Sequence, residues 1–222
     1  WLELMAFSHA VLECGAHAPS HPQAAQDLML AGITPDSRHN NCSGKHTGFV
    51  AMARHLDAGV SGYISPSHPV MNRLVTPAVE DFCRIGLSAQ TPGVDGCGAP
   101  VWSIPLSHLA GGWSQLRSRG SGKRLLQAMV EEPFLVAGTD RACTRLMESA
   151  EGDAAVKTGA EGVFCGVVCV VQPRRAPVPQ PPVMSPLRRR GDRGEDGPRP
   201  LSQRGRRVTR FCCVSCIYTH FL

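Results

Sequence analysis

The segment from His39 to Gly48 carries the kinds of side chain that chemistry requires. It reads His-Asn-Asn-Cys-Ser-Gly-Lys-His-Thr-Gly and so concentrates two amides, a thiol, two hydroxyls, an amine and two imidazoles. These groups can exchange hydrogen bonds, ligate a metal or attack a carbonyl carbon. A purely structural interpretation is an elaborate helix cap, with Asn41 or Ser43 as the capping residue.

A helix is expected directly after this polar segment. Residues 45–58 have apolar side chains at helical spacing, and Gly59 is a typical helix stop. The free N–H groups of the first turn would point back into the polar segment, where they favour an anion that develops during a reaction. Segment and helix together therefore indicate a reactive or ligand-binding loop.

Two further segments could carry chemistry. Residues 93–100 read Gly-Val-Asp-Gly-Cys-Gly-Ala-Pro, and their glycines permit turns that would expose Asp95 and Cys97, although an ordinary tight turn has a similar composition. Residues 157–162 read Lys-Thr-Gly-Ala-Glu-Gly and begin with Lys157 at the end of a predicted strand. Lys-Thr-Gly on a strand beside the nucleophile is also a sequence box of serine β-lactamases and penicillin-binding proteins.

The elements that must position these segments are helices with a few strands. We expect helices at 22–30, 67–86, 106–116 and 124–130, a helix capped by Thr139-Asp140 that runs to Met147, and strands at 101–104, 154–157 and 163–171. Pro77 must kink or split the second helix. The pattern predicts a mixed α+β domain over residues 1–171.

The net charge of +5 conceals two regions of opposite sign. Residues 1–171 hold 12 Lys and Arg against 15 Asp and Glu, whereas residues 172–222 hold 11 Arg against 3 acids and many prolines. With so few core-forming side chains, this basic C-terminal tail is expected to be disordered. No aromatic residues interleave its arginines, so we expect non-specific electrostatic contacts and no specific nucleic-acid partner.

The composition also indicates the cellular location of the protein. The chain has 222 residues and 42% hydrophobic content, enough for a core, but no run near the roughly 18 apolar residues that a membrane span needs. No export signal precedes the ten scattered cysteines, so we expect reduced thiols in a cytoplasmic protein. Cys213 and Cys216 have redox or zinc-ligand spacing, but they lack the second ligand pair that would make it specific.

Taken together and in order, Cys-Ser-Gly-Lys-His, Asp-Gly-Cys-Gly-Ala-Pro and Lys-x-Gly-Ala-Glu-Gly resemble the Rhizobium-type, thermolabile L-asparaginases of the asparaginase II family. The resemblance runs from about Leu12 to Cys165 and includes Leu12-Glu13-Cys14-Gly15 and Val136-Ala137-Gly138, followed by Arg141 and Leu146-Met147. It implies a serine β-lactamase-like fold and a hydrolase of asparagine catabolism that converts L-asparagine to aspartate and ammonia. The implied route is an acyl-enzyme on a serine that lysines activate. A homodimer is one candidate assembly.

The resemblance also implies roles for particular residues. Cys42, Lys45 and Cys97 correspond to the zinc site of the family, Asp95 lies beside it, and Lys157 corresponds to the second catalytic lysine. Two thiolates are natural zinc ligands. A lysine ligand must first lose a proton against a reference pKa near 10.4, so His39 and His46 are the ordinary alternatives for the third ligand.

The sequence departs from the family pattern in ways that affect activity. The family nucleophile lies in an N-terminal Ser-x-x-Lys, but the residues three before Lys45, Lys123 and Lys157 are a cysteine, a glycine and an alanine. Cys143 also replaces the acid of an Asp-Thr pair. Because the chain begins with Trp1 and ends in the Arg/Pro tail, we expect a fragment with a missing N-terminus and an altered C-terminus.

We therefore expect an L-asparaginase-family chain with impaired activity. Within Cys42–His46 the only hydroxyl belongs to Ser43, which is a candidate replacement nucleophile. Ser43 lies two residues before Lys45, however, a spacing that places the two side chains on different faces of a helix. The alternative is a non-catalytic zinc-binding or anion-binding protein.

Overall fold

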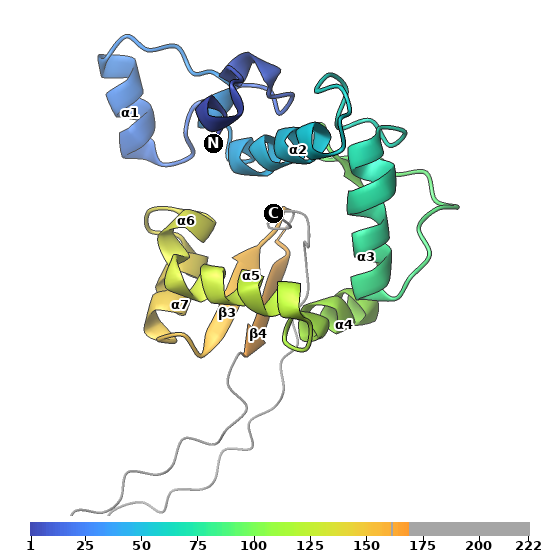
Figure 1. The fold of residues 1–222 in the computed structure, drawn as a ribbon. Helices are drawn as coiled ribbons and strands as arrows, with labels where there is room; N and C mark the ends of the chain where they lie inside the picture. Colours follow the sequence, from blue (N-terminus) through green and yellow to red (C-terminus); the bar gives the residue numbers. More distant parts are fainter. Residues whose placement is uncertain (161, 169–222) are drawn as a thin grey trace, which may run out of the picture. The chain divides into compact units, whose positions relative to one another are not determined.

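The computed structural model describes residues 1–160 and 162–168, which are mainly helical with two small sheets (Figure 1). The α-helices are α1 (Pro22–Leu30), α2 (Ser43–His55), α3 (Thr76–Cys83), α4 (Leu106–Leu116), α5 (Gly120–Glu131), α6 (Pro133–Ala137) and α7 (Ala142–Ser149). The strands are β1 (Gly93–Val94), β2 (Pro100–Val101), β3 (Ala154–Thr158) and β4 (Phe164–Val168). An α+β class is thus confirmed for this part of the chain. The tail predicted to be disordered, residues 172–222, lies outside the described residues.

Local signals locate several helices well. The helices α1 and α4 have the predicted bounds, and α1 places Pro22 in its first turn, where the missing N–H costs nothing. The helix α2 begins two residues before the predicted start and ends at His55. Its N-cap is Cys42, which makes no side-chain capping bond, so the prediction of Asn41 or Ser43 as the cap is wrong. The Oδ1 atom of Asn40 instead accepts a hydrogen bond of 2.8 Å from the Cys42 N–H.

Proline splits the helix that was predicted for residues 67–86. A π-helix spans Val70–Val75, and α3 follows with Pro77 in its first turn. The helix predicted for 124–130 begins earlier, at Gly120, and ends at Glu131, before Pro133, which opens α6 in the same way that Pro22 opens α1. Near α7 the cap is Arg141, and the predicted cap residue Asp140 has a φ of 56° outside the helix.

The strands form two antiparallel pairs in the described residues. In the first, Gly93 lies opposite Val101, so the strand predicted for 101–104 shortens to Pro100–Val101. In the second, Lys157 lies opposite Cys165 in a hairpin that packs on α4, α5 and α7 (Figure 1). Both predicted hairpin strands are confirmed within the described residues. Two-stranded sheets alone do not establish the serine β-lactamase-like arrangement, which stays a prediction.

The described residues contain two apolar clusters. The first cluster comprises Leu12, Cys14, Phe49, Val50, Ala53, Tyr63, Val70, Met71, Cys97 and Ala99. The second cluster comprises Val79, Phe82, Cys83, Leu87, Trp102, Leu109, Trp113, Leu116, Leu126, Met129, Cys143, Met147, Ala155 and Cys165. Burying one large aliphatic or aromatic side chain contributes roughly 1.5–3 kcal/mol, so each cluster is a substantial stabilising unit.

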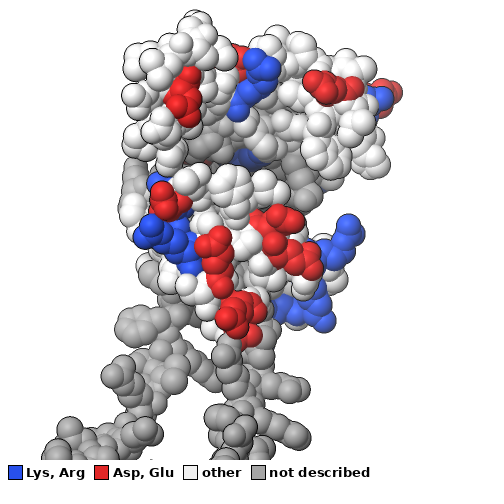
Figure 2. Space-filling model, turned by 90° about the vertical axis from the view of Figure 1, so that its left-hand side faces the viewer, with Lys and Arg blue, Asp and Glu red and all other residues white. Residues whose placement is uncertain are grey.

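The described surface carries charges of both signs. On the face that Figure 2 shows, Asp and Glu side chains are interspersed with Lys and Arg, and neither sign forms a continuous patch. Among the helices that the structure describes, none is long and apolar enough to cross a membrane.

The close approach of α4 and α5 gives a testable prediction. A Cβ added at the buried Gly122 of α5 would lie 2.5 Å from the backbone of Leu116. Gly122→Ala should therefore destabilise the protein by about 1–3 kcal/mol, even though alanine is the better helix former.

The matched control is Gly111→Ala in α4, where an added Cβ meets nothing within 4 Å. This variant should be neutral or stabilising by up to about 1 kcal/mol, because glycine costs that much in a helix interior. Urea unfolding of both variants measures the difference. Equal stabilities for the two would contradict the packing of α5 against α4.

Candidate active site

Two of the three polar segments meet around the ammonium group of Lys45. Its Nζ lies 3.2 Å from the Sγ of Cys97 and 3.5 Å from the Oδ2 of Asp95, and its side chain is only 4% exposed. Lys45 comes from the first turn of α2, whereas Asp95 and Cys97 come from the turn between β1 and β2. The fold therefore brings together residues that are separated by about 50 positions, as the resemblance implied.

The turn between β1 and β2 directs Cys97 inward. The N–H of Asp95 donates to the carbonyl of Ala99 at 2.8 Å, and the N–H of Gly98 donates to the carbonyl of Asp95 at 2.8 Å. Gly98 has a φ of 83°, in the left-handed region that favours glycine. As a result Cys97 is buried with 5% exposure, and the prediction that it is exposed at the turn is wrong. Asp95 remains partly exposed.

The two thiols of the site differ in protonation. Hydrogen bonding with Cys42, and also with His46, holds the pKa of the Cys97 thiol well below its usual value. The same contact, followed by burial, raises the pKa of Cys42. Burial alone would lower the pKa of Lys45, but the Cys42 and Cys97 sulfurs outweigh it and raise that pKa. Of the two thiols, Cys97 is therefore the one that loses its proton more readily.

A second polar group lies behind the site. The imidazole of His46 and the ring of Tyr63 are both fully buried, and His46 Nδ1 lies 2.8 Å from the Tyr63 hydroxyl. The backbone N–H of Glu13 donates to the same hydroxyl at 2.7 Å. Sequence analysis quoted Glu13 only as part of a family segment and missed Tyr63, because nothing local in the sequence marks a tyrosine that meets a histidine 17 positions away.

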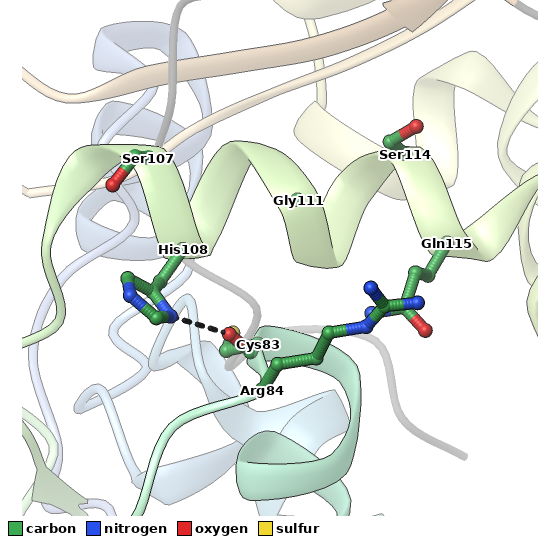
Figure 3. Close-up of a pocket in the computed structure, with 7 residues that line it drawn as sticks. All are labelled: Cys83, Arg84, Ser107, His108, Gly111, Ser114 and Gln115. Carbon is green, nitrogen blue, oxygen red and sulfur yellow. Dashed lines mark hydrogen bonds between the residues drawn. The ribbon is translucent and has the colours of Figure 1, made fainter.

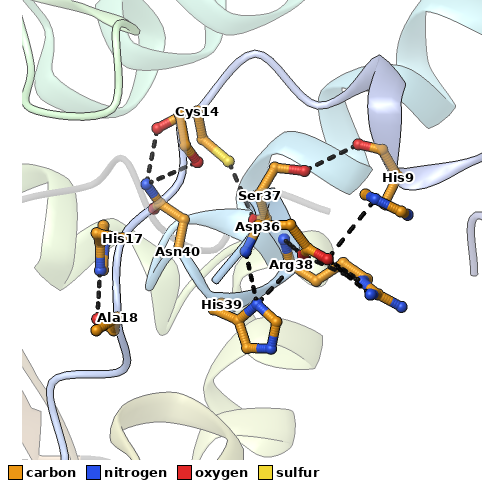
Figure 4. Close-up of polar contacts among 10 residues, drawn as sticks. His9, Cys14, His17, Ala18, Asp36, Ser37, Arg38, His39 and Asn40 are labelled. Atoms are coloured by element: carbon orange, nitrogen blue, oxygen red, sulfur yellow. Dashed lines mark hydrogen bonds and ion pairs between the residues drawn. The ribbon is translucent and has the colours of Figure 1, made fainter. Parts of the chain in front are cut away.

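Figure 4 shows the polar contacts that hold the preceding loops together. The Nδ2 of Asn40 donates to the carbonyl of Cys14 at 2.7 Å, and the hydroxyl of Ser37 donates to the carbonyl of His9 at 2.9 Å. The Nδ1 of His39 accepts from the backbone N–H of Asp36 at 3.0 Å. The imidazole of His39 thus completes a capping box at Asp36. This contact does not bring His39, the alternative third ligand, to Lys45.

The remaining predicted residues lie at different places. Ser43 is a half-buried residue at the start of α2. Lys157 lies on β3, beside the second cluster, and its ammonium group donates to the carbonyl of Thr158. The backbone N–H of Thr158 donates to the buried Cys143 sulfur at 3.0 Å. None of these contacts joins Lys157 to Lys45.

The donor atoms present around Cys97 suit a metal of intermediate softness. In residues 1–160 and 162–168, no group of three or more His, Cys, Asp or Glu side chains is arranged to hold a metal ion. Two thiols and one amine do converge, through Cys42, Cys97 and Lys45. A metal bound there would consequently need Lys45, rather than a third residue of the usual ligand types.

A hollow between α3 and α4 is a weaker candidate site (Figure 3). Its volume is about 390 Å³, and it is lined by Cys83, Arg84, Ser107, His108, Gly111, Ser114 and Gln115. His108 donates through Nδ1 to the carbonyl of Cys83, and Gln115 donates through Nε2 to the carbonyl of Phe82. These bonds tie the end of α3 to α4, so the polar lining serves the packing of the two helices.

Comparison with known proteins agrees with the site geometry. The model of the L-asparaginase II family matches residues 1–175, and the chain therefore belongs to this family of asparaginase-type amidohydrolases. The resemblance inferred from the three polar segments is thereby confirmed. A search of the curated proteins gave no match.

The Lys45–Cys97 pair predicts energetic coupling in the metal-free protein. Cys97→Ala should destabilise it by about 3 kcal/mol, because it leaves a buried ammonium group with only Asp95 as an anionic partner. In a Lys45→Met background the same substitution should cost less, by about 1–3 kcal/mol. Urea unfolding in the presence of a chelator measures the four stabilities of this cycle.

The matched control is Cys83→Ala, since Cys83 is a buried cysteine of the second cluster. Its cost should be the same with Lys45 and with Met at position 45. If the Cys97 and Lys45 substitutions were as additive as this control, the buried pair would not be a stabilising unit.

Proposed function

We propose that this chain acts on L-asparagine and that its reaction is hydrolysis of the side-chain amide to aspartate and ammonia. The observation that carries the proposal is the group formed by Lys45, Asp95 and Cys97, which unites two of the family's polar segments. Membership of the L-asparaginase II family supports the same reaction. We also propose a reducing, cytoplasmic setting, in which the ten scattered cysteines of the sequence stay as thiols.

Amide hydrolysis needs a nucleophile, a proton acceptor and a group that stabilises developing negative charge. In the metal-free protein Lys45 suits only the last of these roles, because its raised pKa keeps the amine protonated at neutral pH. Asp95 is the partly exposed acid beside it and suits contact with the substrate's ammonium group. A protonated Lys45 cannot accept a proton from Ser43, so Ser43 lacks an activating base in this loop.

We also propose zinc as the metal of the site, held by Cys42, Cys97 and Lys45. Zinc supplies Lewis acidity that polarises a carbonyl oxygen. Its ligands must be deprotonated, so Cys42 and Lys45 would lose protons when the metal binds. The convergence of two thiols and an amine in one buried position favours this assignment over zinc binding elsewhere in the described residues.

Zinc content tests the metal assignment. In a background without the cysteines of residues 212–216, the protein purified without chelator should hold about one zinc per chain. A Cys42→Ser, Cys97→Ser double variant should hold none, while a Cys83→Ser, Cys165→Ser double variant should keep it. Equal zinc in all three proteins would remove the assignment, and elemental analysis of the purified proteins decides.

Asparagine turnover tests the catalytic state. We expect the 222-residue chain to release no ammonia above background at millimolar asparagine, because it holds no Ser-x-x-Lys and loss of a serine nucleophile costs on the order of a millionfold in turnover. Fusing a family segment with Ser-x-x-Lys ahead of Trp1 should restore ammonia release. Ser43→Ala should leave the rate of the fused protein unchanged.

Three results would revise this proposal. Robust turnover by the unfused chain that Ser43→Ala abolishes would make Ser43 the nucleophile. Zinc binding without turnover, even after fusion, would favour the non-catalytic zinc-binding alternative. Release of ammonia from glutamine but not from asparagine would change the substrate and leave the reaction class intact.

A further inference from the structure

The hollow between α3 and α4 is lined in part by polar groups that the packing of the two helices does not use. Its volume of about 390 Å³ is in the range of pockets that hold small molecules. His108 and Gln115 serve the packing, because each donates to a carbonyl at the end of α3. Within the residues that the structure describes, the lining side chains of Arg84, Ser107 and Ser114 make no hydrogen bond. The hollow therefore holds donors that are free for a ligand.

The charge of this lining is positive. Among the seven lining residues, Arg84 is the one side chain with a permanent charge. Burial raises the pKa of the Cys83 thiol to about 11, so this thiol adds no negative charge at neutral pH. Asp81 attracts Arg84, but both of its carboxylate oxygens accept hydrogen bonds from Arg119 instead. The charge of the hollow thus favours an anion.

Arg84 occupies a backbone position that favours glycine. It ends α3 with a φ of 52° and a ψ of 50°, in the left-handed region where many helices place a glycine. Its N–H closes the last turn by donating to the carbonyl of Glu80. Glycine would adopt this conformation with less strain, so the backbone does not require an arginine there. Residues held in such conformations cluster at functional sites.

The groups of the hollow lie along one side of α4. Figure 3 shows Arg84 reaching toward Gln115, with His108 nearer the other end of the helix. Gly111 lies between His108 and Gln115 on α4, and a Cβ added there would meet nothing within 4 Å. The surface of the helix is therefore open at this point, and a ligand bound to Arg84 could rest against it.

We propose that this hollow is a binding site for a small oxyanion, held by the guanidinium of Arg84 over the open surface of α4 at Gly111. A planar guanidinium donates two parallel hydrogen bonds to a carboxylate or to a phosphate, so either group can be the source of the oxyanion. The site shares no residue with the group around Lys45. It is therefore independent of the amide hydrolysis proposed above.

NMR of the ¹⁵N-histidine-labelled chain tests the site. His108 lines the hollow and acts as the reporter, whereas His68, which binds the Gly59 carbonyl, is the reference. L-Aspartate and inorganic phosphate are titrated separately at constant pH and ionic strength, and at least one should shift the His108 signal saturably while the His68 signal stays unchanged. A response to aspartate alone would identify a carboxylate site, and a response to phosphate alone a phosphate site. If neither shifted the His108 signal, the proposal would be wrong.

Two variants separate ligand binding from folding. Arg84→Gly removes the guanidinium and suits the left-handed backbone, so its unfolding midpoint should be equal or higher. Its affinity for the anion should fall roughly 10–100-fold, which corresponds to the loss of hydrogen bonds to a charged group. Gly111→Leu keeps Arg84 but fills the hollow, and its affinity should fall at least as far.

The matched control is Arg117→Gln. Arg117 lies at the end of α4, outside the lining of the hollow, and its side chain makes no hydrogen bond in the described part of the chain. Because salt screens a charge that does not touch the ligand, this variant should bind the anion within about twofold of the wild type. Wild-type affinity in Arg84→Gly or in Gly111→Leu, or an equal loss in Arg117→Gln, would overturn the proposal.

Discussion

The arrangement of the first cluster depends on the buried Lys45 ammonium, which donates to the Cys97 sulfur and forms an ion pair with Asp95. Removing an ammonium group from water costs several kcal/mol even after a protein relaxes around it. Lys45 is 4% exposed, so this cost has to be offset by Cys97 at 3.2 Å and Asp95 at 3.5 Å. Those partners sit on a turn some 50 residues further along the chain. The pair therefore fixes the first turn of α2 against the β1–β2 turn more strictly than apolar packing alone would.

Several of the surrounding polar groups are paired in a way that leaves few alternatives, although His46 Nε2 and Glu13 Oε2 are buried without a hydrogen-bond partner in the described residues. Asn40 is buried and donates to the carbonyl of Cys14, while its Oδ1 accepts from Cys42 at the start of α2. Tyr63 accepts from Glu13 and contacts His46. Buried hydrogen-bond networks of this kind favour one arrangement, because each partner lost leaves an unsatisfied group in a low dielectric. The second cluster is instead mostly apolar, with helices packed on the β3–β4 hairpin.

The sequence predicts what is local in this structure and misses what is not. The bounds of α1 and α4, the split at Pro77 and the β3–β4 hairpin all follow from spacing and from the backbone limits of proline and glycine. The burial of Cys97 was missed, because glycines that permit an exposed turn equally permit one folded inward. The contact of His46 with Tyr63 has no local signal. The meeting of Lys45 with Cys97 could be expected only from family resemblance.

The ion pair also limits the chemistry that this loop can perform. A lysine activates a serine by accepting its proton, and Lys45 is held in the protonated form by two sulfurs. Lys157 contacts Thr158 within the β3 hairpin, and Cys143 occupies the position where the family resemblance places an acid. Of the groups that could activate a hydroxyl, Lys157 is thus hydrogen-bonded within its own hairpin, and the acid is replaced by Cys143. What this loop presents is a partly exposed carboxylate at Asp95 beside the buried ammonium group of Lys45, an arrangement suited to binding and polarising a polar ligand.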